Sequence, residues 1–159
     1  MVARIRAAVP EASLTTDLIV GFPGETEEDF QQLMAFIEEI RYDQAYTFIY
    51  SKRSGTPAAE VSVFAVYACQ FDEVKHQRLN RLMELQNRIS LEINQQLVGR
   101  TLEVMVEGPS HTDETVWNGR TDTNKLVLWQ YTGKEKPGDL VQVKIQQAQT
   151  WILKGTLEA

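Results

Sequence analysis

The sequence has few of the residues that build metal centres and covalent cross-links. Cys69 is its only cysteine, so no disulfide can form within the chain. A cubane iron–sulfur cluster needs at least three cysteine ligands, which this chain cannot supply alone. The two histidines, His76 and His111, lack the short spacing of zinc ligands. We therefore predict no metal site, no cofactor bound by this chain alone, and no catalytic residue within it.

Long apolar runs and an excess of positive charge are also missing. No run approaches the roughly 18–20 apolar residues of a membrane span, and residues 1–10 lack the apolar core and cleavage site of a signal peptide. We therefore expect a cytoplasmic protein without a membrane partner. The net charge of −6 argues against a surface that binds nucleic acid everywhere. Residues 1–98 carry 9 basic and 14 acidic side chains, and residues 99–159 carry 7 and 8, which leaves room for a local basic patch.

The first third of the chain has the pattern of a βαβ unit. A strand is predicted at Leu14–Gly21, where consecutive apolar residues are typical of a strand covered on both faces. Thr26 is placed to cap a helix with three acidic residues in its first turn. A second strand is predicted at Ala45–Tyr50, so the sheet is expected to be parallel. The helix has one apolar face, formed by Phe30, Leu33, Met34, Ile37 and Ile40.

A long helix and a group of short strands are predicted next. Apolar residues recur at steps of three and four through Phe71–Val98, and Gly99 ends this helix. From Thr101 onward the alternation has a period of two, and glycine–proline and asparagine–glycine pairs interrupt it. Five short strands in about 60 residues without a helix indicate a small closed β-barrel. The predicted fold is therefore an α/β segment followed by an all-β barrel, with the boundary near Val98.

Three stretches together resemble signatures of the MiaB-type tRNA methylthiotransferases, in the same order and at similar separations. They are TTDLIVGFPGETEEDF at residues 15–30, FIYSKRSGTPAA at residues 48–59 and GRTDTNKLVLW at residues 119–129. The resemblance covers nearly the whole chain, apart from the apolar run Val61–Gln70. It implies that residues 1–98 are the C-terminal part of a radical-SAM domain, with the last two strands of a partial barrel and a connecting helix. Residues 99–159 would be a TRAM domain, a small RNA-binding β-barrel.

The resemblance also implies a function. Members of the family use S-adenosylmethionine and two [4Fe–4S] clusters, and the isopentenyladenosine type, closest to this sequence, methylthiolates C2 of N6-isopentenyladenosine next to the tRNA anticodon. The CxxxCxxC motif of the radical-SAM cluster is absent here. We therefore expect part of such a transferase, inactive alone, whose partners are tRNA and a missing N-terminal part of the same enzyme.

Three other interpretations are open. In the first, the chain is a stand-alone RNA-binding TRAM adaptor. In the second, it is part of a sister methylthiotransferase acting on another substrate, and in the third it is the product of a decayed gene. The DNA before Met1 separates the enzyme from the adaptor. A reading frame that continues into CxxxCxxC favours the enzyme, and a genuine start at Met1 favours the adaptor.

The resemblance assigns cofactor-side residues to two loops that follow the predicted strands. Glycine lets backbone approach a ligand closely, and loops at the C-terminal ends of barrel strands build active sites. The alternative is an ordinary turn and helix cap in the first loop and a solvated arginine in the second. In the second loop Lys52 and Ser54 replace two family prolines. The residues expected to face S-adenosylmethionine are Gly21, Phe22, Pro23, Gly24, Glu25, Tyr50, Ser51 and Arg53.

The segment Gly119–Lys125 is the RNA-contact candidate. Arg120 and Lys125 are its cations, and Trp117 and Trp129 lie nearby in the sequence. Cations beside flat aromatic rings suit contact with RNA backbone and stacking on bases. The alternative is a turn between two strands whose tryptophans fill the barrel core, and we expect at least one tryptophan to do so. With little net charge, the barrel should bind RNA weakly.

Overall fold

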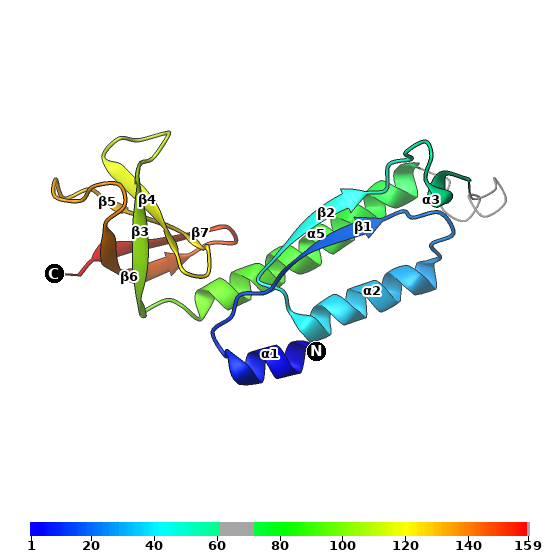
Figure 1. The fold of residues 1–159 in the computed structure, drawn as a ribbon, viewed down its shortest axis with the longest axis horizontal. Coiled ribbons are helices and arrows are strands. Elements are labelled where there is room, and N and C mark those ends of the chain that lie inside the picture. The colour runs from blue at the N-terminus through cyan, green and yellow to red at the C-terminus, as the bar shows by residue number, and fades with distance from the viewer. Residues whose placement is uncertain (61–71, 159) are drawn as a thin grey trace. The chain divides into compact units, whose positions relative to one another are not determined.

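The computed structural model describes residues 1–60 and 72–158, and the chain divides into two compact units, Met1–Ile89 and Ser90–Ala159. Figure 1 shows the elements of each unit. The apolar run Val61–Gln70 lies outside the described residues. Among the helices of residues 1–60 and 72–158, none is both long and apolar enough to cross a membrane.

The first unit is built around a parallel pair of strands. Strand β1 pairs with β2 from Thr15 opposite Gln44 to Val20 opposite Ile49, which confirms the predicted parallel βαβ unit. The long predicted helix is also confirmed, as α5. The elements are α1 (Val2–Ala8), β1 (Thr15–Val20), α2 (Glu27–Ile40), β2 (Gln44–Ile49), α3 (Pro57–Glu60) and α5 (Asp72–Gln95), whose last turns belong to the second unit.

Helix α2 begins where the sequence predicts, at a capping box. The Thr26 hydroxyl accepts from the Asp29 backbone N–H at 3.1 Å, and the Asp29 carboxylate accepts from the Thr26 backbone N–H at 2.9 Å. These bonds satisfy two backbone donors that the helix itself leaves open. The hydrogen bonds from Thr26 lower the pKa of Asp29 below its usual value. Phe30 and Ile37 form the fully buried part of the apolar face.

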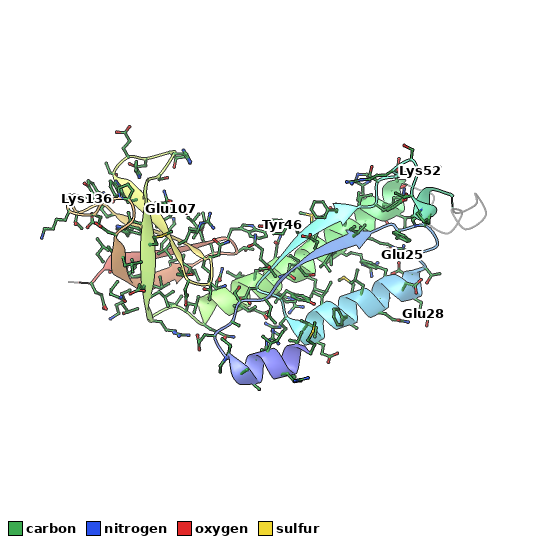
Figure 2. All side chains as sticks on the ribbon, in the orientation of Figure 1. Glu25, Glu28, Tyr46, Lys52, Glu107 and Lys136 are labelled. Carbon is green, nitrogen blue, oxygen red and sulfur yellow. The ribbon has the colours of Figure 1, made fainter. Side chains whose placement is uncertain are left out.

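The expectation that β1 is covered on both faces is wrong for the described residues. Leu18 and Val20 of β1 are buried, but Ile19 between them is 52% exposed. On β2, Tyr46 and Phe48 are 54% and 50% exposed, and Figure 2 labels Tyr46 on this strand. Strand side chains alternate between faces, so one face of the pair packs and the other stays open. Three consecutive apolar residues in β1 cannot reveal that only one face finds a neighbour.

A buried arginine of α5 fastens the loop between β1 and α2. Arg78 is 3% exposed, and its Nη1 donates to the Glu25 Oε1 at 2.7 Å and to the Glu25 carbonyl at 3.2 Å. Its Nε donates to Glu27 Oε2 at 3.3 Å, and its guanidinium lies over the Phe30 ring at 5.6 Å. The other Glu25 oxygen accepts from the Gly21 backbone N–H at 3.0 Å. The shape of the loop therefore depends on a carboxylate that Arg78 neutralises.

The second unit confirms the predicted five-stranded closed barrel. Its strands follow the order β3-β4-β5-β7-β6, with β5 and β7 parallel and the other pairs antiparallel. The core residues are Val104, Val106, Val127, Trp129, Val143, Ile145 and Leu153. The strands are β3 (Thr101–Pro109), β4 (Val116–Thr121), β5 (Leu126–Gln130), β6 (Leu140–Ala148) and β7 (Ile152–Leu157).

Two glycines allow neighbouring strands of the barrel to approach closely. A Cβ on Gly119 would overlap the Met105 carbonyl oxygen, and it would lie 2.7 Å from a methyl carbon of Val104. Gly155 has the same relation to the Lys144 carbonyl. Backbone atoms cannot move aside as a flexible side chain can, so these positions have no room for another residue.

We predict that Gly119→Ala destabilises the barrel by about 3 kcal/mol or more, because the added carbon displaces the β3 backbone. Denaturant unfolding followed by tryptophan fluorescence measures this, since Trp129 is buried in the core. Gln146→Ala, an exposed change on β6, serves as the control and should cost under about 0.5 kcal/mol. Equal stability of the two variants would contradict the prediction.

We also predict that Arg78→Met destabilises the first unit by about 3–5 kcal/mol, because the nearly buried Glu25 carboxylate then lacks its cation. Adding Glu25→Gln should recover part of this loss. Arg81→Met is the matched control, since Arg81 makes an exposed ion pair with Glu27 at 2.9 Å, and such pairs contribute about 1 kcal/mol or less. Denaturant titration followed by circular dichroism distinguishes the variants.

Candidate functional site

The two predicted cofactor-side loops lie together at one end of the β1–β2 pair. Both strands run in the same direction, so the loops that follow them meet at the same edge. The Phe22 and Tyr50 rings contact edge to face with centroids 5.0 Å apart, and the Tyr50 N–H donates to the Val20 carbonyl at 2.8 Å. Figure 2 shows Glu25 and Lys52 at this end of the sheet. The structure therefore brings the two loops into contact.

The first loop is held by hydrogen bonds within it and by Arg78 of α5. Gly21 has a φ of +74°, and a Cβ there would lie 2.8 Å from Cγ of Lys75. The Glu25 N–H donates to the Phe22 carbonyl at 2.9 Å, and both Glu25 carboxylate oxygens accept from Arg78 or Gly21. Glu25 therefore holds the loop in shape, while the Phe22 ring, 47% exposed, faces solvent. A ligand at this loop would meet the ring and backbone before the Glu25 carboxylate.

The second loop offers an exposed cation. Ser51 and Arg53 are exposed, and the Arg53 carbonyl accepts from the Thr56 hydroxyl at 2.8 Å. Within residues 1–60 and 72–158, the Arg53 guanidinium forms no ion pair. A guanidinium can donate two parallel hydrogen bonds to a carboxylate or phosphate. This side chain is chemically suited to the anionic part of a ligand.

In the barrel, the predicted RNA-contact cations both have partners within the protein. Arg120 Nη1 donates to the Asn124 carbonyl at 3.1 Å, and its Nε lies 3.6 Å from the Glu107 carboxylate. Lys125 Nζ donates to Asn94 Oδ1 at 3.0 Å. Arg120 is still 39% exposed, whereas Lys125 is half-buried and helps to shape the turn. The two cations therefore differ in their access to RNA.

The two predicted RNA-contact tryptophans also differ. Trp129 is 2% exposed in the barrel core. Its ring cannot stack on a base, so the prediction that Trp129 contacts RNA is wrong. The alternation of β5 turns this residue inward together with Val127. Trp117 is partly buried and stacks on Tyr131, with centroids 4.1 Å apart and an interplanar angle of 3°. One face of the Trp117 ring is therefore already covered.

Sequence reasoning missed the most exposed tryptophan of the described residues. Trp151 is 52% exposed and lies directly before β7, which begins at Ile152. The alternation at Thr150–Leu153 predicts a strand that includes Trp151, and this residue was not among the predicted RNA contacts. The turn between β6, which ends at Ala148, and β7 contains no glycine or proline that would have marked it in the sequence.

No group of three or more histidine, cysteine, aspartate or glutamate side chains capable of holding a metal ion is found in the described part of the chain. Cys69 lies outside that part. The acidic side chains near the candidate loops, Glu25 and Glu27, are engaged by Arg78 and Arg81.

Comparisons with known proteins agree with this arrangement. The TRAM domain model matches residues 95–157. The chain is 50% identical over 155 residues to the tRNA-2-methylthio-N(6)-dimethylallyladenosine synthase of Desulforamulus reducens, covering 98% of this chain and 32% of the relative. The synthases of Carboxydothermus hydrogenoformans and Acetivibrio thermocellus are 51% and 47% identical, over 99% of this chain and 34% and 32% of the relatives.

The chain therefore spans about a third of the length of the curated relatives it matches. That third includes the TRAM domain, which coincides with the closed barrel. The family resemblance carried by the three sequence motifs is confirmed. This chain contains a TRAM domain, and nearly its whole length is similar to about a third of these tRNA-2-methylthio-N(6)-dimethylallyladenosine synthases.

Proposed function

We propose that this chain is the part of a tRNA-2-methylthio-N6-dimethylallyladenosine synthase that contributes cofactor-side loops and an RNA-binding barrel. In this proposal residues 1–98 belong to the radical-SAM domain and residues 99–159 form the TRAM domain. The complete enzyme would act in the cytoplasm on N6-isopentenyladenosine next to the tRNA anticodon, adding a methylthio group at C2. The observation that carries the proposal is the similarity of nearly the whole chain to such synthases.

The loops after β1 and β2 suit one side of an S-adenosylmethionine site. Phe22 presents an exposed ring that can pack against adenine, and Arg53 presents a guanidinium that can bind the carboxylate of the cofactor. Gly21, Pro23 and Gly24 shape the backbone of the first loop, and Arg78 holds the Glu25 carboxylate in place. Tyr50 and Ser51 complete the set, and Tyr50 acts by supporting the Phe22 ring.

The sequence does not suit an iron–sulfur cluster. Iron–sulfur clusters are held in proteins by several cysteine thiolates, so the single thiol of Cys69 cannot anchor a [4Fe–4S] cluster. The two [4Fe–4S] clusters would belong to the part of the enzyme that supplies the remaining cysteines. In this proposal the present chain binds and positions the cofactor and the tRNA. The bond-making chemistry would take place on residues outside it.

The barrel would bring the tRNA to the enzyme. Among the cations predicted for this role, Arg120 keeps an exposed guanidinium, and its ion pair with Glu107 is exposed and therefore weak. Lys125 contributes by fixing the turn through Asn94, and Trp117 contributes the partly exposed edge of its stack with Tyr131. Because the barrel is closed and forms its own core, a second candidate function, that of a stand-alone RNA-binding adaptor, needs only this unit.

We predict that the purified 159-residue chain forms no [4Fe–4S] cluster on anaerobic reconstitution with iron and sulfide, because one cysteine cannot ligate it. It should also produce no methylthiolated adenosine from isopentenylated tRNA with S-adenosylmethionine and reductant. Absorbance near the cluster bands and mass spectrometry of digested tRNA measure the two outcomes. A brown protein that cleaves S-adenosylmethionine would refute the proposal.

We predict that the same chain binds tRNA weakly, with an affinity that falls only modestly as salt rises, because the 7 basic side chains of residues 99–159 are offset by 8 acidic ones. Arg120→Gln should lower the slope of log affinity against log salt by about 1. Lys144→Gln on β6, an exposed cation 3.9 Å from Glu158, is the matched control. The absence of measurable tRNA binding at low salt would remove the RNA-binding role.

A further inference from the structure

The outer face of three adjacent barrel strands forms a continuous surface. In the register, Arg120, Leu126 and Ile152 are neighbours across β4, β5 and β7, and so are Asn118, Leu128 and Lys154. The residues between these two rows are the buried Gly119, Val127 and Leu153. Because strand side chains alternate, the two rows point away from the core. We call these six outward residues the β4–β5–β7 face.

This face has a favourable charge for RNA although the chain as a whole is acidic. The sequences of β4, β5 and β7, which are VWNGRT, LVLWQ and ILKGTL, contain no aspartate or glutamate. By contrast, β3 carries Glu103 and Glu107. Lys154 is exposed and makes no ion pair within residues 1–60 and 72–158. The face therefore has two cations, one in each row, over an aliphatic surface with no carboxylate of its own.

An exposed tryptophan stands at the end of this face. Trp151 directly precedes β7, and it is 52% exposed. The turn that carries it is fixed, because the buried Asn94 donates to the Gln149 carbonyl at 3.0 Å and to the Thr150 carbonyl at 3.1 Å. The Gln149 N–H closes the turn on the Ile152 carbonyl at 2.8 Å. A large ring on a fixed turn loses little conformational freedom when a ligand stacks on it.

The same asparagine links this turn to the predicted RNA-contact segment. Asn94 Oδ1 accepts from Lys125 Nζ at 3.0 Å. Because Leu126 pairs with Ile152 in a parallel arrangement, the preceding residues Lys125 and Trp151 lie at the same end of β5 and β7. Trp151 is therefore the exposed tryptophan at the strand end that carries Lys125, whereas Trp129 is buried.

We propose that the β4–β5–β7 face together with Trp151 binds unpaired RNA. A base stacks on the Trp151 indole, the aliphatic surface covers the neighbouring nucleotide, and Lys154 and Arg120 contact phosphates. Unpaired RNA is favoured over a protein partner because the face combines an exposed ring with cations and carries no acceptor carboxylate. This inference rests on the proposed RNA-binding function of the barrel, and it names the residues and the form of RNA that it recognises.

The test compares variants of the full 159-residue chain by fluorescence anisotropy with two labelled RNAs. One is a hairpin with an unpaired loop, and the other is a fully paired duplex of similar length. Trp151→Ala should weaken hairpin binding by about 5- to 150-fold, the range expected from removing one stacked base. Trp151→Phe should retain most of the affinity, and duplex binding should change little in either variant.

Two further variants separate stacking from charge. Lys154→Gln should lower the slope of log affinity against log salt by about 0.7 to 1, whereas Trp151→Ala should leave the slope unchanged. Leu140→Ala, which truncates a 64% exposed side chain on β6, is the control for Trp151→Ala. Thermal unfolding verifies that each variant is folded.

The outcomes distinguish this inference from the function it rests on. If the unmodified chain binds neither RNA, the RNA-binding role of the barrel fails. If the chain binds the hairpin but Trp151→Ala and Lys154→Gln both bind as tightly as the unmodified chain, RNA contacts another surface and this inference is overturned. If the duplex binds as tightly as the hairpin and is equally weakened by Trp151→Ala, the preference for unpaired RNA is overturned.

Discussion

Buried polar side chains on one helix must find hydrogen-bond partners, and much of the surrounding structure follows from this constraint. Along α5, Arg78, Gln86 and Asn94 are buried and spaced at multiples of four residues. Each reaches backbone of a different segment: the Glu25 carbonyl, the Tyr42 carbonyl, and the carbonyls of Gln149 and Thr150. A buried polar group without a partner costs about 1–3 kcal/mol. The loops that these groups hold are consequently fixed in shape although they contain few apolar residues.

The parts of the fold that depend on local periodicity could be predicted from the sequence. The Thr26 cap, the apolar stripe of α5 and the alternation of the barrel strands each need only neighbouring residues to be recognised. The open face of β1 and β2 could not be predicted, because burial of Ile19 depends on what packs against it. The orientation of Trp129 depends on strand register, which a shift of one residue would reverse.

In the candidate sites, too, some features could be predicted from local sequence and others depend on contacts between distant residues. Sequence motifs placed the two loops after β1 and β2, and the parallel pairing brings them together. They could not reveal that Glu25 is occupied by Arg78, since 53 residues separate the two in the sequence. Nor could they reveal that Trp151 and Lys125 lie at the same end of β5 and β7, because that placement arises from the pairing of these two strands. Contacts between distant residues decide which side chain of a motif remains available to a ligand.

The closure of the barrel has a consequence for how such a unit can be combined with others. Every strand from β3 to β7 has a neighbour on both sides, so the barrel offers no backbone edge to which another strand could add. A unit of this kind can be joined to different proteins through evolution without inviting fibre-like association between copies. The parallel pair β1–β2 lacks this protection, because each of its strands has only one partner among the described residues.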